Sequence, residues 1–302
     1  MVMKRFNVGA LSVSRIIESE LPILSAREVY PDWNDEAIAP HLSWMVPRHY
    51  QPETGSLVTT IQSYLVRTAH HTILVDACGG NDKDRNRPHF DHADTTWLDT
   101  LAAAGCQPEQ VDFVLCTHLH VDHVGWNTRL LDGCWVPTFP NAKYLFARTE
   151  LEHWLAEADA TGLSRTGDYV ADSVMPVLEA KREVIVETDH AIEDGVWLEP
   201  LPGHTPGQFG VHLKSGDAEA VISGDMMHHM LQCHLPHWST NFCTDQDAAR
   251  QTRRAFLERY AETGILVATA HFPSPSVGTI ERAGQSFGFR YVGIDSPQIF
   301  QN

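Results

Sequence analysis

The sequence predicts an α+β fold, on three observations. Short runs rich in β-branched and aromatic residues recur in both halves of the 302-residue chain. Segments with apolar residues at helical spacing alternate with these runs. Hydrophobic residues make up 43% of the chain and no low-complexity tract interrupts it, so a sizeable core can form. Periodicity alone therefore indicates a mixture of helices and strands, without fixing their arrangement.

The N-terminal part begins with residues 4–18, whose loose alternation of polarity predicts opening strands. The next segment, 21–51, is rich in proline and aromatic residues and is expected to form a structured loop. Three roles are open for this loop: a lid, an arm that contacts a second subunit in a homodimer, or plain surface. In either of the first two roles, Trp33 or Trp44 would contribute to a pocket wall.

A β-hairpin is expected next, formed by 56–67 and 72–76 around a short turn. Residues 94–104 have the apolar spacing of a helix that ends at Gly105. The apolar run 111–116 follows directly, and its length and composition predict a strand.

The alternation of strands and helices continues through the middle of the chain. Residues 143–146 predict a strand, and 149–152 have the pattern of a capping box that opens the next helix. A weaker helical pattern at 162–181 indicates an insertion that covers the functional face. Strands resume at 183–187 and 196–199.

The last third is predicted to contain a hairpin, a long helix and a final strand. Residues 209–213 and 218–222 form the hairpin, with Gly216 in its turn. Asp245 is the candidate N-cap of a helix that extends through Ala261. Residues 265–270 form the last strong strand.

Four metal-ligating side chains occupy six positions directly after the 111–116 strand: His118, His120, Asp122 and His123. His118 and His120, two residues apart, can bind one ion from an extended backbone. Asp122 and His123 follow after the chain turns, so they can reach a second ion. Imidazole together with carboxylate suits zinc or a similar divalent metal. A lone histidine here would indicate a solvated loop, but four ligands in this register favour a metal site.

This motif resembles the HxHxDH signature of the metallo-β-lactamase superfamily of hydrolases. That family adds a histidine in a Gly-His-Thr-Pro-Gly type of turn, a bridging aspartate after Ser-Gly, and a last histidine near the C-terminus. The sequence has His204 within such a turn at 202–207, Asp225 after Ser223-Gly224, and His271 after the final strand. The ligands thus follow the family's order over nearly the whole chain.

The resemblance implies a single domain over 1–302, folded as a four-layer αβ/βα sandwich of two packed β-sheets with helices outside. It also implies two divalent metal ions per chain, with Zn²⁺ favoured and Mn²⁺, Co²⁺ or Fe²⁺ as alternatives. The first ion would be held by His118, His120 and His204, and the second by Asp122, His123 and His271. Asp225 would bridge both ions together with a hydroxide, which would act as the nucleophile.

Two further residues acquire roles from the resemblance. Asp76, at the end of the 72–76 strand, would orient a ligand imidazole, with ordinary turn capping as the alternative. His228 stands where lactonases of the superfamily have a tyrosine and a phosphotriesterase-like branch has a histidine. It would donate a hydrogen bond to the developing oxyanion or the leaving oxygen, which makes Asp122, Asp225 and His228 the predicted catalytic set.

The chain resembles the N-acyl-homoserine lactonase and methyl parathion hydrolase branches, so we expect a hydrolase that opens lactones or cleaves carboxyl esters. The alternatives are a phosphotriesterase using the same site and, from another class, a mono-iron persulfide dioxygenase, which needs only two histidines and one carboxylate. Apolar residues beside the ligands in sequence favour a hydrophobic substrate, although each suits the core equally; they are Trp126, Met226, Met227, Leu231, Trp238 and Phe272.

Charge and composition limit the kinds of binding partner and the cellular location that we expect. The 22 Lys and Arg residues against 39 Asp and Glu give a net charge of −17, which repels nucleic acid and anionic lipid. The N-terminus lacks the apolar stretch of a signal peptide and no long apolar run occurs, so a cytoplasmic location without membrane contact is expected. The six cysteines show no CxxC pair, which argues against a thiolate zinc site or a disulfide scaffold.

Overall fold

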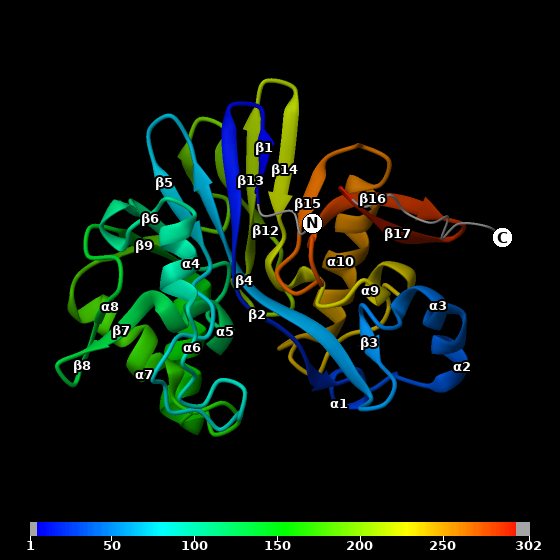
Figure 1. Ribbon diagram of the computed structural model, residues 1–302, viewed down its shortest axis with the longest axis horizontal. Helices are drawn as coiled ribbons and strands as arrows, with labels where there is room; N and C mark the ends of the chain where they lie inside the picture. The colour runs from blue at the N-terminus through cyan, green and yellow to red at the C-terminus, as the bar shows by residue number, and fades with distance from the viewer. Residues whose placement is uncertain (1–4, 294–302) are drawn as a thin grey trace.

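The computed structural model describes residues 5–293, and two large β-sheets packed face to face form its centre (Figure 1). The first sheet has the strand order β1-β2-β4-β5-β6-β9-β10, and β3 pairs with β4 beside this path. Its strands are β1 (Arg5–Val8), β2 (Leu11–Ser25), β3 (Tyr50–Gln51), β4 (Ser56–Arg67), β5 (Thr72–Val75), β6 (Phe113–Leu115), β9 (Lys143–Ala147) and β10 (Glu183–Val186).

The second sheet keeps the order of the chain, β11-β12-β13-β14-β15-β16-β17, and its parallel pair, β14 and β15, is joined by a crossover through α9 (Leu231–His234) and α10 (Gln246–Tyr260). Its strands are β11 (Ala191–Glu193), β12 (Val196–Pro200), β13 (Phe209–Ser215), β14 (Ala218–Ile222), β15 (Leu266–Ala268), β16 (Val277–Ala283) and β17 (Ser286–Tyr291). A separate two-stranded sheet joins β7 (Thr128–Leu131) to β8 (Cys134–Pro137).

Helices cover the outer faces of both sheets (Figure 1). Beside the first sheet lie α4 (Trp97–Ala103), α6 (Arg148–Thr161), α7 (Tyr169–Ser173) and α8 (Met175–Glu179), and beside the second α9 (Leu231–His234) and α10 (Gln246–Tyr260). The shorter ones are α1 (Ala26–Val29), α2 (Asp35–Ile38), α3 (Leu42–Met45), α5 (Val121–Val124) and the 3₁₀ turns η1 (Ala39–His41), η2 (Pro108–Gln110), η3 (Gly125–Asn127) and η4 (Gly224–Met226). None of the described helices has the length and apolar character needed to cross a bilayer.

The central strands bury both of their faces, because successive side chains of a strand point to opposite sides of the sheet. Leu74 and Val114 face outward and pack in a cluster with Trp97 of α4. Their neighbours Ile73 and Leu115 face inward, toward the second sheet. Burial on both faces explains why β5 and β6 are continuous apolar runs in the sequence. The predicted α+β four-layer sandwich is therefore confirmed.

The 21–51 segment is not the loop that its composition predicts. Residues 21–25 complete β2, which pairs with β4 as far as Ser25 opposite Ser56. The pairing register shifts between Pro22 and Leu24, and such a bulge accommodates a proline inside a strand. Short helices α1 to α3 fill much of the remainder. A role for this segment as a lid or a dimer arm stays a prediction.

The predicted capping box at 149–152 is also wrong. Helix α6 begins at Arg148, its N-cap is Ala147, and no side chain caps its first turn. The Glu150 carboxylate accepts instead from the backbone N–H groups of Leu119 and Gly207, both outside the helix. The Glu150 carboxylate therefore holds two distant loops and does not cap its own helix.

Candidate functional site

The first four predicted ligands follow β6 on one short stretch of backbone. His118 and His120 lie in the turn after the strand, and Asp122 and His123 lie in the single-turn helix α5. The stretch is fixed to the loop after β5, where the Ala77 N–H donates to the His123 carbonyl at 2.8 Å. Gly125 is required at this junction, because a Cβ there would lie 1.9 Å from the Gly79 carbonyl oxygen.

The other three ligands arrive on loops of the second sheet. His204 lies between β12 and β13, and His271 follows β15. Asp225 lies in the turn η4 after β14, preceded by Gly224 with φ +50°. A Cβ on Gly224 would also press against the Thr117 side chain at 3.0 Å, so glycine is favoured there on two grounds.

Glu150 joins the two halves of this arrangement. Its buried carboxylate accepts from Leu119 N–H at 2.9 Å, between His118 and His120, and from Gly207 N–H at 2.9 Å, close to His204. Burial raises the pKa of this carboxyl group, although its hydrogen bonds from the two backbone groups oppose the shift. One carboxylate therefore sets the distance between two ligand loops.

The nitrogens of three imidazoles converge on one point. His204 Nε2 lies 3.2 Å from His118 Nε2 and 2.8 Å from His120 Nδ1, and the last two atoms are 3.1 Å apart. Burial lowers the pKa of His120 to about 4 and holds those of His118 and His204 well below their usual values. Neutral imidazoles offer lone pairs, and three lone pairs directed to one point suit a metal ion.

A second group consists of Asp122, His123 and His271, which also bring their ligand atoms close together. His271 Nδ1 lies 2.9 Å from the Thr60 carbonyl, and His123 Nδ1 lies 2.9 Å from an Asp76 oxygen. Because a carbonyl can only accept, Nδ1 of His271 is the protonated nitrogen and Nε2 faces the centre. Asp76 fixes His123 in the same way, which agrees with its predicted orienting role.

Asp225 lies between the two groups. Its Oδ1 is 3.0 Å from His271 Nε2 and 3.3 Å from His123 Nε2, while its Oδ2 is 3.4 Å from His204 Nε2. Burial disfavours the charged carboxylate, but the surrounding imidazoles outweigh burial and hold its pKa well below the ordinary value. The same carboxylate raises the pKa of His123 and His271 against the effect of their burial.

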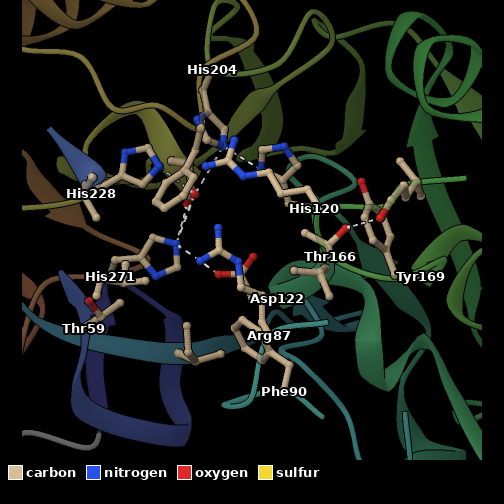
Figure 2. A pocket seen from close by; sticks show the side chains of 18 of the residues that line it. Thr59, Arg87, Phe90, His120, Asp122, Thr166, Tyr169, His204, His228 and His271 are labelled. Carbon is tan, nitrogen blue, oxygen red and sulfur yellow. Dashed lines mark hydrogen bonds and ion pairs between the residues drawn. The ribbon is translucent and has the colours of Figure 1, made fainter. Parts of the chain in front are cut away.

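The donor set fits divalent metal ions. His123 Nε2 and Asp225 Oδ1 are buried and have no hydrogen-bond partner within residues 5–293, although both face the shared centre. Buried polar atoms without a partner are costly unless something binds them. Nitrogen and carboxylate oxygen together suit a borderline ion such as zinc. The structure thus brings together all seven predicted ligands in two adjoining groups, of which Figure 2 labels His120, Asp122, His204 and His271.

His228 stands beside these groups. Its Nε2 lies 3.3 Å from Asp225 Oδ2, and its ring stacks on that of His271 at 5.8 Å. The Gln232 side chain accepts from the His228 backbone N–H at 2.8 Å and fixes this position. Neither ring nitrogen has a hydrogen-bond partner among the described residues, and burial lowers the pKa of the ring. A neutral His228 therefore has one N–H available.

A pocket of about 400 Å³ opens onto the centre, a volume suited to a small molecule (Figure 2). Asp122, His120, His204, His271 and His228 all line it. Its other walls come from five separate segments and are mostly apolar; they include Ile23, Leu24, Val29, Leu57, Phe90, Trp154, Leu163, Tyr169 and Phe242. The 162–181 insertion does cover the functional face, since Leu163 to Thr166 and Tyr169 line the pocket.

The pocket walls predicted from sequence are wrong. Trp126 stacks on Trp97 at 5.4 Å and donates to Glu18, inside the core of the first half. The others do not line the pocket either and pack in or against hydrophobic clusters, one with Met226, Met227 and Phe272 and one with Leu231, Trp238, Trp33 and Trp44. Proximity in sequence to a ligand did not place a side chain in the pocket, because short turns reverse the chain at each ligand.

The model of the metallo-beta-lactamase superfamily matches residues 58–271. N-acyl homoserine lactonase AiiA of Bacillus thuringiensis subsp. kurstaki is 26% identical over 125 residues, which are 41% of this chain and 42% of the relative. A lactonase of the same description from Bacillus sp. is 29% identical over 125 residues, again 42% of its length. The chain thus spans less than half the length of the curated relatives that it matches.

Two solved structures resemble the fold over nearly the whole chain. The hydrolase AbOPH in the beta lactamase superfamily has a TM-score of 0.81 at 25% identity, covering 98% of this chain and 99% of that one. AidC, described as a dizinc quorum-quenching lactonase, has a TM-score of 0.76 at 21% identity, covering 97% and 98%. With the family match over most of its length and the ligand loops in place, the chain belongs to the metallo-beta-lactamase superfamily.

Proposed function

We propose that the chain is a dinuclear-metal hydrolase that opens lactones or cleaves carboxyl esters with hydrophobic groups. The observation that carries this proposal is the position of Asp225, whose carboxylate lies between the two groups of buried ligands. It is 3.4 Å from His204 Nε2 of the first group, and 3.0 and 3.1 Å from His271 Nε2 of the second. A mono-iron dioxygenase needs only one such group. The second group, with two imidazoles fixed by Asp76 and Thr60, has no role in a mononuclear centre.

His118, His120 and His204 would hold one ion, Asp122, His123 and His271 the other, and Asp225 both. Two divalent ions, most simply zinc, would activate a water molecule at neutral pH and polarise the substrate carbonyl. Asp225 and Asp122 supply the negative charge that this centre requires. Asp76 and the Thr60 carbonyl direct the lone pairs of two imidazoles inward.

His228 would act on the substrate directly. Its ring lies in the pocket wall, where Nε2 is 3.3 Å from Asp225 Oδ2 and neither ring nitrogen forms a well-aligned hydrogen bond with a described residue. An N–H preorganised in a water-poor site stabilises the negative charge that develops on a substrate oxygen. We therefore assign His228 the hydrogen bond to the oxyanion or to the leaving oxygen.

The apolar walls support a hydrophobic acyl or alkoxy group. Leu163, Phe90 and Phe242 can bury such a group close to the ligand loops. The names of the relatives, N-acyl homoserine lactonases, support a lactone carrying an acyl chain as one substrate.

The proposal is tested by metal analysis and a substrate comparison. The zinc-loaded protein should contain two ions per chain, and kcat/KM should be higher for N-hexanoyl-homoserine lactone or 4-nitrophenyl hexanoate than for an aryl dialkyl phosphotriester. One iron per chain with oxygen uptake would contradict the proposal. A higher kcat/KM for the phosphotriester would show that the substrate class is wrong, whereas the proposed dinuclear metal centre would still stand.

A further inference from the structure

Two arginines, Arg87 and Arg165, line the pocket and have no role in the proposed metal centre. In Figure 2, Arg87 lies on the same side of the pocket as Asp122 and Phe90. Arg165 comes from the insertion after α6, and its guanidinium lies 5.3 Å from the centre of the Phe242 ring. Two separate segments of the chain therefore each place one positive charge at the same cavity.

Neither charge is neutralised by the protein. The Arg87 guanidinium forms no hydrogen bond or ion pair within the described part of the chain, and only its backbone carbonyl is used. Arg165 donates to the Asn241 carbonyl at 3.2 Å, which carries no net charge. The pocket contains three acids, Asp122, Glu157 and Asp225, but none of them forms an ion pair with these arginines among residues 5–293.

The two guanidiniums also repel each other. Burial lowers the pKa of Arg165 most strongly, and the positive charge of Arg87 lowers it further. In a chain with a net charge of −17, two unneutralised cations facing one cavity are unexpected unless an anion joins them. An anion between them would turn a repulsion into two favourable contacts.

The segments that carry these arginines are tied together. The Asn86 side chain donates to the Ser164 carbonyl at 2.7 Å, and the Asn86 backbone N–H donates to the Thr166 carbonyl at 3.1 Å. Arg85 anchors the first segment through two bonds, of 2.6 and 2.7 Å, to the Asp172 carboxylate. Each arginine is adjacent in sequence to one of these contacts. The two backbone segments that carry the arginines are therefore held close to each other before any ligand binds.

We propose that Arg87 and Arg165 form a carboxylate-binding subsite. The inference rests on the proposed function and sharpens its substrate class: an ester or lactone with a hydrophobic body and a carboxylate at the end remote from the scissile bond. Guanidinium groups suit this ligand, because their paired N–H groups match the two oxygens of a carboxylate. The apolar wall between the arginines and the metal ligands would hold the body of the substrate.

The test compares two esters that differ by one charge, mono-4-nitrophenyl adipate and 4-nitrophenyl hexanoate, with the zinc-loaded enzyme. In the double variant Arg87→Gln/Arg165→Gln, kcat/KM for the adipate should fall by about 10- to 100-fold, the range expected for lost charge-assisted hydrogen bonds. For the hexanoate it should change by less than about 3-fold. Equal losses on both esters, or no loss on the adipate, would overturn the subsite.

Two controls isolate the effect. Arg254→Gln removes one exposed charge from α10, outside the pocket lining, and should leave the ratio of the two kcat/KM values unchanged. Arg87→Lys/Arg165→Lys keeps both charges without the paired donors and should lie between the wild type and the Gln variant. A full loss of adipate selectivity in Arg254→Gln would attribute the effect to overall charge and reject the subsite.

Binding without turnover separates this inference from the proposed function. Hexane-1-sulfonate carries an anion that coordinates metals weakly, so its dissociation constant, measured by calorimetry on the zinc-loaded protein, reports on the arginines. It should rise by about 10-fold in the double Gln variant and remain unchanged in Arg254→Gln. This result would support the subsite even if no ester were hydrolysed, whereas equal affinity in the wild type and the double Gln variant would reject it.

Discussion

The two ligand groups of the centre are held in different ways. In the second group, the Thr60 carbonyl accepts from His271 Nδ1 at 2.9 Å, and an Asp76 carboxylate oxygen lies at ion-pair distance, 2.9 Å, from His123 Nδ1. In the first group the outer contacts are weaker: the Thr117 hydroxyl lies 3.2 Å from His118 Nδ1, and the Cys243 sulfur lies 3.6 Å from His204 Nδ1. The first group is ordered mainly by the packing of its rings.

This difference implies that the two proposed ions would be held in place by different kinds of contact around their ligands. A carboxylate behind an imidazole fixes its tautomer and increases its basicity, so the second group is held by polar contacts. The first group depends on the close approach of His118, His120 and His204, and on Trp154, whose ring centre lies 4.9 Å from that of His120. Substitutions that act on one support should therefore affect one ion more than the other.

Removing Asp225 should have the largest effect, because this residue serves both groups. We expect Asp225→Ala to lower kcat/KM by on the order of 1,000-fold or more and to reduce bound metal, measured by plasma emission spectrometry. Asp217→Ala, in the exposed turn at the other end of the β13–β14 hairpin, is the matched control and should behave as the wild type. Two retained ions with near-normal activity would contradict the assignment.

His228→Ala should separate rate from metal content. Because His228 is not among the seven predicted ligands, two ions should stay bound while kcat falls by roughly 10- to 1,000-fold, the loss expected for one oxyanion donor. His228→Tyr restores a donor and should recover part of the rate on lactones, if the pocket accepts the larger ring. An Ala variant with normal kcat, or one that loses metal together with rate, would exclude the role.

Asp76→Asn tests the polar support of the second group. Asparagine can adopt the positive φ of 62° found at this position, so the backbone should be retained. Loss of the carboxylate should weaken binding of the ion at His123 by about 10- to 100-fold. The other ion should be affected less, through Thr117, whose N–H and hydroxyl also donate to Asp76 and which adjoins His118. Stepwise chelation followed by metal analysis would show this, and an equal loss of both ions would remove the distinction between the groups.

The smallest effect is expected for Cys243→Ala, which tests the first group. A thiol at 3.6 Å is a weak partner for His204, so binding of both ions should change by less than about 3-fold. A loss as large as that of Asp76→Asn would show that His204 depends on Cys243 as strongly as His123 depends on Asp76. Parallel titrations of the two variants make this comparison directly.

Local spacing indicated four candidate ligands and the family resemblance added three, and the structure brings all seven together. Most strands were also predicted, because strand periodicity is a local property. The sequence was insufficient for the pocket, whose walls combine Leu24, Phe90, Leu163 and Phe242 from segments far apart in the chain. Arg87 and Arg165 carry no local pattern that distinguishes them from surface arginines. The β7–β8 hairpin was missed although its turn residues Asp132 and Gly133, both with positive φ, are a strong hairpin signal.

The hairpin formed by β16 and β17, which follows the last predicted ligand, His271, was missed as well. Its strands place Phe287 and Phe289 on the helical side of the second sheet, packed with Phe272. The 149–152 segment was assigned a capping box, since its local sequence fits one, whereas the Glu150 carboxylate within it accepts from distant loops. That contact joins residues remote in sequence, which a local pattern does not reveal.

Glu150 also has a consequence for the order of folding. Its carboxylate joins Leu119 and Gly207, which belong to opposite halves, and can bind both only when the two sheets have docked. Closing such a long chain segment is slow relative to forming local hairpins such as β4–β5. A refolding chain should therefore form its local hairpins first and bring the ligand loops joined by Glu150 together later, so that metal uptake marks a late step of folding.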